Sequence, residues 1–152
     1  MNLLQVRDRI RDKAITSGLT YTEIETLRDI NELQNQQMPC LLWNYTGENA
    51  DINDVVQTFD LDFYVIGTYF DDILIETNDY ERDFVVTEKH KLREVFKTFI
   101  SSLGIETAND FLIVQSVTTI PITERLGTDN LNVLYFRVTA QVKKDYCLNV
   151  ED

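Results

Sequence analysis

The sequence has few of the residues on which catalytic and metal sites depend. Its 152 residues include one histidine, His90, and two cysteines, Cys40 and Cys147. One His and two distant Cys cannot assemble a zinc site, and two Cys are too few for a disulfide scaffold, so we expect free thiols in a reducing compartment. The five glycines are scattered over predicted caps and turns and form no phosphate-binding loop. The sequence therefore predicts no cofactor, no metal and no enzymatic activity.

The sequence also lacks a long apolar run. Its first residues, MNLLQVRDRIRDK, carry charges within the first turns, which is not the pattern of a signal peptide. No stretch approaches the roughly 18 apolar residues of a membrane-spanning helix. We therefore expect an intracellular protein with no membrane insertion.

Basic residues are scarce relative to acidic ones. The chain has 14 Lys and Arg against 26 Asp and Glu, for a formal net charge of −12 at pH 7. This balance disfavours unaided binding to nucleic-acid phosphates, which requires clustered Lys and Arg. Two interpretations stay open: solubility through self-repulsion, or an acidic surface that meets a basic partner or lets a polyanion pass.

The few polar clusters are typical of a solvated surface. Lys89, His90, Lys91 and Arg93 form a small basic cluster, which we interpret as the exposed face of a helix, with His90 a surface residue rather than a catalytic base. The Ser101–Ser102 pair has no partner base at a useful spacing, so nucleophilic catalysis is unsupported.

The sequence from Thr87 to Gly104 predicts the helix around which the fold is organised. Thr87 is a suitable N-cap, and Gly104 stands where a left-handed stop is expected. Its apolar residues recur at helical spacing and predict one stripe that packs on a sheet: Leu92, Val95, Phe96, Phe99 and Leu103.

Two further helices are predicted before it. Leu3–Ile15 is amphipathic, with Asn2 as its cap and Gly18 as its end. Thr22–Gln34 has apolar residues at every third position and stops before Pro39.

Four segments read as strands: Cys40–Tyr45, Leu61–Tyr69 with a lead-in from Val55, Phe111–Ile120 and Leu131–Val142. The second reads as a central strand covered on both faces for part of its length, with Gly67 marking a bulge or a close backbone approach. Pro121 ends regular pairing or marks a sheet edge. Trp43, in the first strand, is predicted as a core anchor, with an interface role as the alternative.

The last strand alternates most clearly. One face is predicted to lie under the main helix: Leu134, Phe136, Val138, Ala140 and Val142. The polar segments Thr46–Asp54 and Thr123–Asn130 are expected to be loops, and residues 143–152 a loose tail. Together these elements predict a single α+β domain over residues 1–152, an antiparallel β-sheet with amphipathic helices packed on one face.

The connection Phe70–Asp83 carries an apolar triplet embedded in acids. A connection this long in a compact domain is usually functional or disordered. We expect it to be an arm that its own domain does not fully cover, and we assign it to a subunit interface: Asp71, Asp72, Ile73, Leu74, Ile75 and Glu76.

In this order of elements the chain resembles the small tail-terminator and tail-completion proteins of tailed bacteriophages, and the neck ring proteins that share their fold. Those proteins begin with an amphipathic helix, as here, and continue with a strand after a proline, here Pro39 and CLLWNY. A long strand running into an acidic connection follows, here LDFYVIGTYFDD, and then a helix closing on Leu-Gly, here FISSLG. Two antiparallel strands and a basic-polar tail finish the domain, here ending LNVLYFRVTAQVKKDY. The added helix at Thr22–Gln34 and the long Thr46–Asp54 loop depart from that pattern and suggest a specialised ring protein, such as a neck component of a short-tailed, crAss-like phage.

The resemblance implies a non-enzymatic virion protein of the tail or neck, assembled in the host cytoplasm. It would form a homo-oligomeric ring, six- or twelve-fold, between portal and tail proteins, with DNA passing through without specific binding. Two alternatives stay open: a small acidic intracellular adaptor or inhibitor that binds a basic protein, and an enzyme or small-molecule-binding α+β domain.

Overall fold

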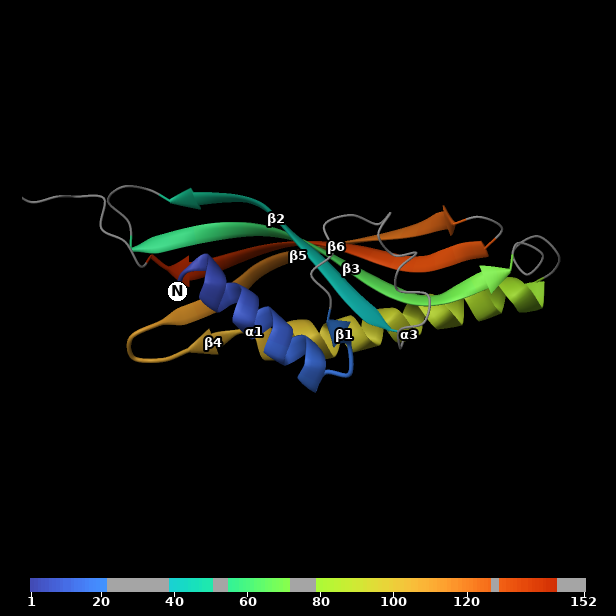
Figure 1. Cartoon of the computed structure of the whole chain (residues 1–152), viewed down its shortest axis with the longest axis horizontal. Coiled ribbons are helices and arrows are strands. Elements are labelled where there is room, and N and C mark those ends of the chain that lie inside the picture. Colours follow the sequence, from blue (N-terminus) through green and yellow to red (C-terminus); the bar gives the residue numbers. More distant parts are fainter. Residues whose placement is uncertain (22–38, 51–54, 72–78, 127–128, 145–152) are drawn as a thin grey trace, which may run out of the picture.

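Two helices pack on a six-stranded, mostly antiparallel, curled sheet in the computed structural model (Figure 1). The structure describes residues 1–21, 39–50, 55–71, 79–126 and 129–144. The sheet order is β1-β2-β3-β6-β5-β4. The elements are α1 (Leu3–Thr16), β1 (Thr20–Tyr21), β2 (Cys40–Ala50), β3 (Val56–Asp71), α3 (Asp79–Leu103), β4 (Ile105–Glu106), β5 (Phe111–Leu126) and β6 (Asp129–Lys143). The predicted α+β class is confirmed. The predicted helix Thr22–Gln34, and the tail from residue 145, lie outside the described residues.

Helix α1 begins and ends as predicted. The Asn2 side chain accepts from the Gln5 amide at 2.9 Å, and the Gln5 side chain accepts from the Asn2 amide at 2.8 Å, which is a capping box. At the other end Gly18 has φ of 89°, the left-handed conformation that glycine adopts without strain. The Leu19 amide then donates to the carbonyl of Ala14 at 2.9 Å, which completes a Schellman motif.

Helix α3 starts and ends differently from the prediction. It begins at Asp79 rather than at the expected cap Thr87, and it runs for 25 residues. Its first five residues include three acids, which suit the positive end of a helix dipole. The prediction for Gly104 is also wrong, because Gly18 is the only described residue with positive φ. The carbonyls at this end are satisfied instead by the Arg9 side chain of α1, which donates to Leu103, to Ser102 at 3.1 Å and to Gly104 at 2.9 Å.

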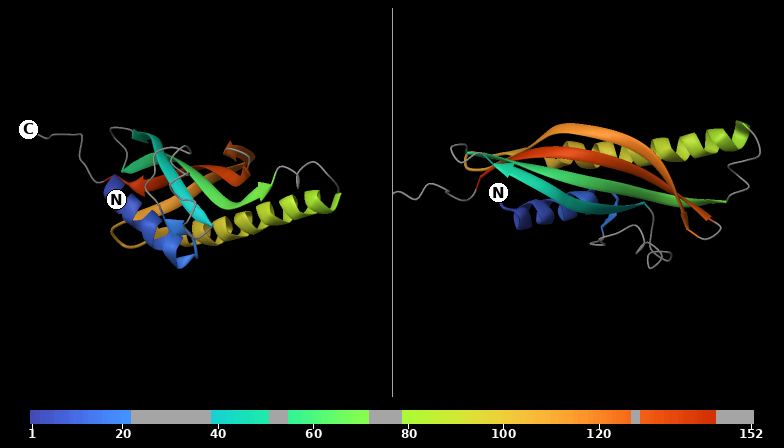
Figure 2. Two further views of the ribbon diagram at one scale, coloured as in Figure 1. Left: turned by 45° about the vertical axis from the view of Figure 1, so that its right-hand side comes forward. Right: turned by 90° about the horizontal axis from the view of Figure 1, so that it is seen from above.

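The core lies between α3, α1 and the β3–β6 ladder, with both helices on one side of the sheet (Figure 2). Phe96 of α3 stacks on Phe136 of β6, with ring centroids 3.6 Å apart and an interplanar angle of 11°. Phe63 of β3 packs against Phe99 of the same helix, with ring centroids 5.5 Å apart. The predicted apolar stripe of α3 and the predicted inner row of β6 are thereby confirmed, and their members other than half-buried Val95 are all buried.

The strands are longer than predicted. β2 continues through the expected loop to Ala50, with a bulge between Tyr45 and Gly47, because its polar half pairs with β3. The expected loop Thr123–Asn130 is also wrong, since β5 runs to Leu126 and β6 starts at Asp129. Polar residues are acceptable there because an antiparallel sheet can face water on one side.

β3 is the central strand that was predicted, between β2 and β6. Near its end Val65 and Ile66 point to opposite faces and both are fully buried, which confirms cover on both faces for part of its length. Its register with β6 shifts between Ile66 and Tyr69, as expected from Gly67. On the outer face Ile66 pairs with the equally buried Val133 and Cys40.

Candidate functional site

Both long edges of the sheet are open in the described part of the chain. β4 pairs with β5 only at Phe111 and Leu112, and β1 pairs with β2 only at Cys40 and Leu41. Beyond these short pairings, no described strand lies on the outer side of β5 or of β2. An open edge presents unpaired N–H and C=O groups that can pair with another chain.

The β5 edge is apolar and carries no charge over its first ten residues, Phe111–Ile120. Ile113, Val117 and Ile120 are 45%, 40% and 42% exposed. A bulge at Val114–Ser116 and the proline at position 121 limit the regular, unprotected ladder to Ser116–Ile120. Pro121 therefore marks an edge strand, as the sequence predicted, and it does not end the pairing with β6.

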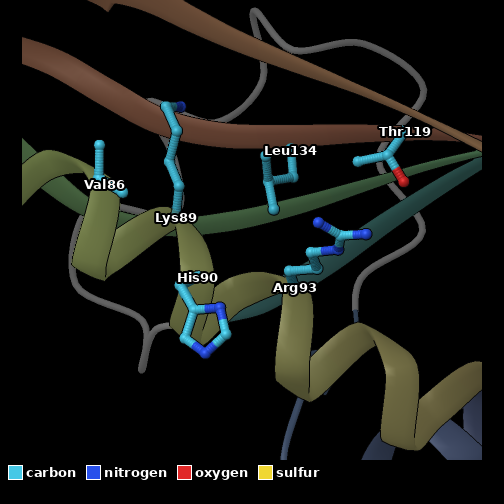
Figure 3. Close-up of a pocket in the computed structure, with 6 residues that line it drawn as sticks. All are labelled: Val86, Lys89, His90, Arg93, Thr119 and Leu134. Atoms are coloured by element: carbon cyan, nitrogen blue, oxygen red, sulfur yellow. The ribbon is translucent and has the colours of Figure 1, made fainter.

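A groove runs along the helix side of this edge, between α3 and the β5–β6 hairpin (Figure 3). Its volume is about 450 Å³. The described residues that line it are Val86, Lys89, His90, Arg93, Thr119 and Leu134. Thr119 belongs both to the groove and to the open edge, so the two features form one continuous surface.

The groove is cationic, and one of its cations is uncompensated. Figure 3 shows the Lys89 and Arg93 side chains extending from α3 toward the sheet, whereas the His90 ring points away from it. The Lys89 ammonium donates to the carbonyl of Val133 at 3.3 Å, and burial lowers the pKa of its amine. Arg93 is exposed and makes no hydrogen bond or ion pair with any described residue.

Two other basic residues of α3 are paired with acids of the same helix. Lys91 lies 2.8 Å from Glu88, and Lys97 lies 3.3 Å from Glu94. Lys91 and Glu88 line a second hollow of about 500 Å³ on another side of α3. The sequence analysis interpreted the basic cluster as one exposed helix face. In the structure its members lie on two sides of α3, and only the side with Lys89 and Arg93 faces the β5 edge.

The outer face of the sheet carries a separate polar network. The Tyr135 hydroxyl donates to the Asp62 carboxylate at 2.7 Å, and Arg137 lies 3.8 Å from the same carboxylate. The Tyr64 and Tyr135 rings are 5.0 Å apart. Burial, and then the hydrogen bond to Asp62, raise the pKa of the Tyr135 phenol. These groups satisfy one another, so the network presents no obvious vacancy for a ligand.

The predicted interface segment falls mainly beyond the described residues. Asp71 is the last residue of β3 and pairs with Asp129, while Asp72, Ile73, Leu74, Ile75 and Glu76 lie outside them. This assignment stays a prediction.

The remaining candidates lie apart from one another. His90 is exposed, 3.9 Å from Glu94, as expected for a surface residue. Ser101 and Ser102 donate to backbone carbonyls of their own helix. Trp43 is half-buried against the core, with its indole donating to the Tyr21 hydroxyl at 2.9 Å.

Of the two cysteines, Cys40 lies within the part of the chain that the structure describes. Cys40 is free, as predicted; it is also buried, and burial raises the pKa of its thiol to about 12. Cys147 lies outside the described residues. Among the residues that the structure describes, no three His, Cys, Asp or Glu side chains gather into a possible metal site.

The acidic excess is unevenly distributed along the chain. The described residues contain 13 Lys and Arg and 15 Asp and Glu, a net charge of −2 against −12 for the whole sequence. Ten of the twelve excess negative charges therefore belong to the segments at 22–38, 51–54, 72–78 and 145–152. The described body is close to neutral, and this is why a cationic groove can exist in so acidic a protein.

No known family model matches the sequence, and no curated protein matches it significantly. In the described ranges, neither helix has the length and apolar character needed to cross a bilayer.

Proposed function

We propose that the protein is a structural subunit that assembles through the open edges of its sheet into a ring of a tailed-phage head–tail connector. The observation that carries the proposal is the pair of open edges, on β5 and on β2, at opposite ends of one sheet order. Joining the β5 edge of one copy to the β2 edge of the next is a head-to-tail contact. Such a contact repeats and closes into a ring when its rotation divides a full turn.

The composition of the β5 edge supports an assembly role. Soluble proteins usually protect long edge strands with charges, and the stretch Ser116–Ile120 has none. Exposed Val117 and Ile120 would be covered in an assembly. The net charge of −12 suits a ring through which DNA passes, because an acidic lumen does not hold DNA by counterion release. The resemblance to tail-terminator and neck proteins supplies the proposed setting: a ring of six or twelve copies between portal and tail, in the virion.

Native mass spectrometry and electron microscopy of the full chain, alone and with portal or tail proteins, test the proposal. We expect discrete closed oligomers at micromolar concentration or on the partner. Val117→Lys and Ile120→Lys should reduce assembly at least about tenfold, because a charge on an edge strand opposes pairing. Leu4→Lys is the matched control, since Leu4 is 61% exposed on α1 and lies on neither edge.

A protein that stays monomeric with every such partner would contradict the proposal. A salt-sensitive one-to-one complex with a basic protein would instead favour the adaptor alternative.

A further inference from the structure

The register of the hairpin determines which side chains flank the groove. Thr119 and Val117 of β5 pair with Phe136 and Val138 of β6, whose side chains face the helices. Thr119 and Val117 therefore face the groove side, whereas Ile120, which pairs with Tyr135, faces the outer side. A strand added along this edge would place alternate side chains in the groove and on the outer face.

The two sides of this docking position have different chemistry. On the groove side an added strand would meet the Lys89 and Arg93 cations, between which Leu134 lies in the view of Figure 3. On the outer side it would meet the exposed apolar side chain of Ile120. The position thus selects a strand that alternates between acidic or apolar residues on one side and β-branched apolar residues on the other.

Within residues 71–76, which have the sequence DDILIE, positions 72–76 have this alternation. In an extended strand Asp72, Leu74 and Glu76 share one face, and Asp71, Ile73 and Ile75 share the other. The first face has two carboxylates around an apolar side chain, which complements two cations around Leu134. The second face offers two isoleucines for contact with Ile120.

Building on the proposed function, we infer that the β5 edge and its cationic groove form the receptor for residues 71–76 of a second copy of the chain. The arm of the neighbouring copy, in place of its β2 edge, adds backbone pairing to Ser116–Ile120, and Arg93 binds an arm carboxylate. A buried or half-buried pair of this kind contributes mainly to specificity and to the choice of register. The contact is head-to-tail, because the arm follows β3 and the receptor lies on β5 of the neighbour.

Mixing two defective variants tests this inference in the full-length protein. An Arg93→Glu, Val117→Lys variant has a defective groove and an intact arm. An Ile73→Ser, Leu74→Ser, Ile75→Ser variant has an intact groove and a defective arm. We expect each alone to stay monomeric, and an equimolar mixture to give a one-to-one heterodimer that grows no further, because only one arm–groove contact can form. Native mass spectrometry resolves the three species, and Arg11→Glu on α1 is the matched surface control.

A peptide experiment keeps the test independent of ring formation. The probe is a labelled peptide of residues 69–78, YFDDILIETN, added to the arm-defective variant. We expect saturable binding by fluorescence anisotropy, weakened at least about tenfold by Arg93→Glu and recovered in part when the peptide carries Asp72→Lys or Glu76→Lys. A scrambled peptide of the same composition is the control.

The outcomes separate this inference from the proposed function. Rings that form normally from both variants, with no peptide binding, would overturn the arm–groove contact and leave the ring proposal standing. Circular dichroism melts of each variant within about 2 °C of the parent exclude misfolding as the cause of lost assembly. A parent that never assembles while the peptide still binds would support the groove as a receptor for acidic strands and count against the ring.

Discussion

The guanidinium of Arg9 caps a helix to which it does not belong, by donating to the carbonyl of Leu103 at the end of α3. Further bonds to the carbonyls of Ser102 and Gly104 place a positive charge at the negative end of the helix dipole. Burial lowers the pKa of the Arg9 side chain, but a guanidinium stays protonated throughout the physiological range. One side chain therefore fixes the position of α1 against the end of α3.

Replacing this cap should cost stability. We expect Arg9→Met to lower the free energy of unfolding by about 1–2 kcal/mol, because the carbonyls lose charged donors while the apolar stem is retained. Arg11→Met is the control, since Arg11 pairs with Asp8 and Asp12 of its own helix, and it should change stability by less than about 0.5 kcal/mol. Urea denaturation measures both, and equal effects would contradict the capping role.

The two helix-end glycines should respond oppositely to alanine. Gly18→Ala should destabilise by about 1 kcal/mol, because φ of 89° is strained for any residue with a Cβ. At Gly104 φ is not positive, and an added Cβ would lie 3.6 Å from the carbonyl of Leu112, an ordinary contact. Gly104→Ala should therefore be neutral or slightly stabilising. Thermal melts of the two variants measure these changes. A large loss of stability in Gly104→Ala would indicate that Gly104 does adopt the left-handed conformation that the sequence predicted.

The Cys40 thiol should be unreactive in the folded protein. In a Cys147→Ser variant at pH 8, we expect an aromatic disulfide reagent to modify Cys40 only after denaturant is added, because the buried thiol holds its proton. Rapid modification without denaturant would contradict the burial.

The same thiol makes stability depend on alkaline pH. Burial raises the pKa of Cys40 from 9.0 to about 12, so between these values the folded state keeps a proton that the unfolded state releases. Stability from this residue is therefore complete below pH 9 and is lost as the pH rises toward 12. The difference in unfolding free energy between the protein and its Cys40→Ala variant should narrow over the accessible part of that range. A constant difference would show that the thiol titrates normally.

The aromatic stack should be the most sensitive point of the core. Phe96→Ala should cost about 3–5 kcal/mol, because it removes a fully buried ring packed face to face on Phe136. Val86→Ala, on the same helix but 66% exposed, should change stability by less than about 0.5 kcal/mol. Chemical denaturation of both variants provides the comparison, and similar losses would place the core elsewhere.

The spacing of apolar residues predicted the elements that bury one face against the core. Helical spacing from Leu92 to Leu103 and alternation from Leu134 to Val142 specify buried rows, and the structure buries both. The start of α3 was missed because the run Phe84–Val86, just before the expected cap Thr87, is aromatic and β-branched and has low helix propensity. The far half of β2, TGENA, has little strand propensity of its own, and its ladder with β3 holds it extended.

Contacts between distant segments were beyond sequence reasoning. The cap of α3 comes from Arg9, more than 90 residues earlier, so Gly104 at the helix end was the natural but wrong candidate. The groove required α3 to be placed beside β5, which brings Arg93 near Thr119. The basic cluster itself was visible in the sequence, but which of its members line the groove and which pair with acids of α3 depends on the packing.

The central ladder also governs how quickly the chain can fold. It joins β3 to β6, so that Val56 pairs with Lys143 across 87 positions of sequence. Closing so large a loop has an entropic cost that must be met before the pairing stabilises anything, and sheets of this kind fold on timescales of about milliseconds to seconds. During synthesis β3 emerges from the ribosome long before β6, and its aromatic face stays exposed to solvent until β6 has also emerged.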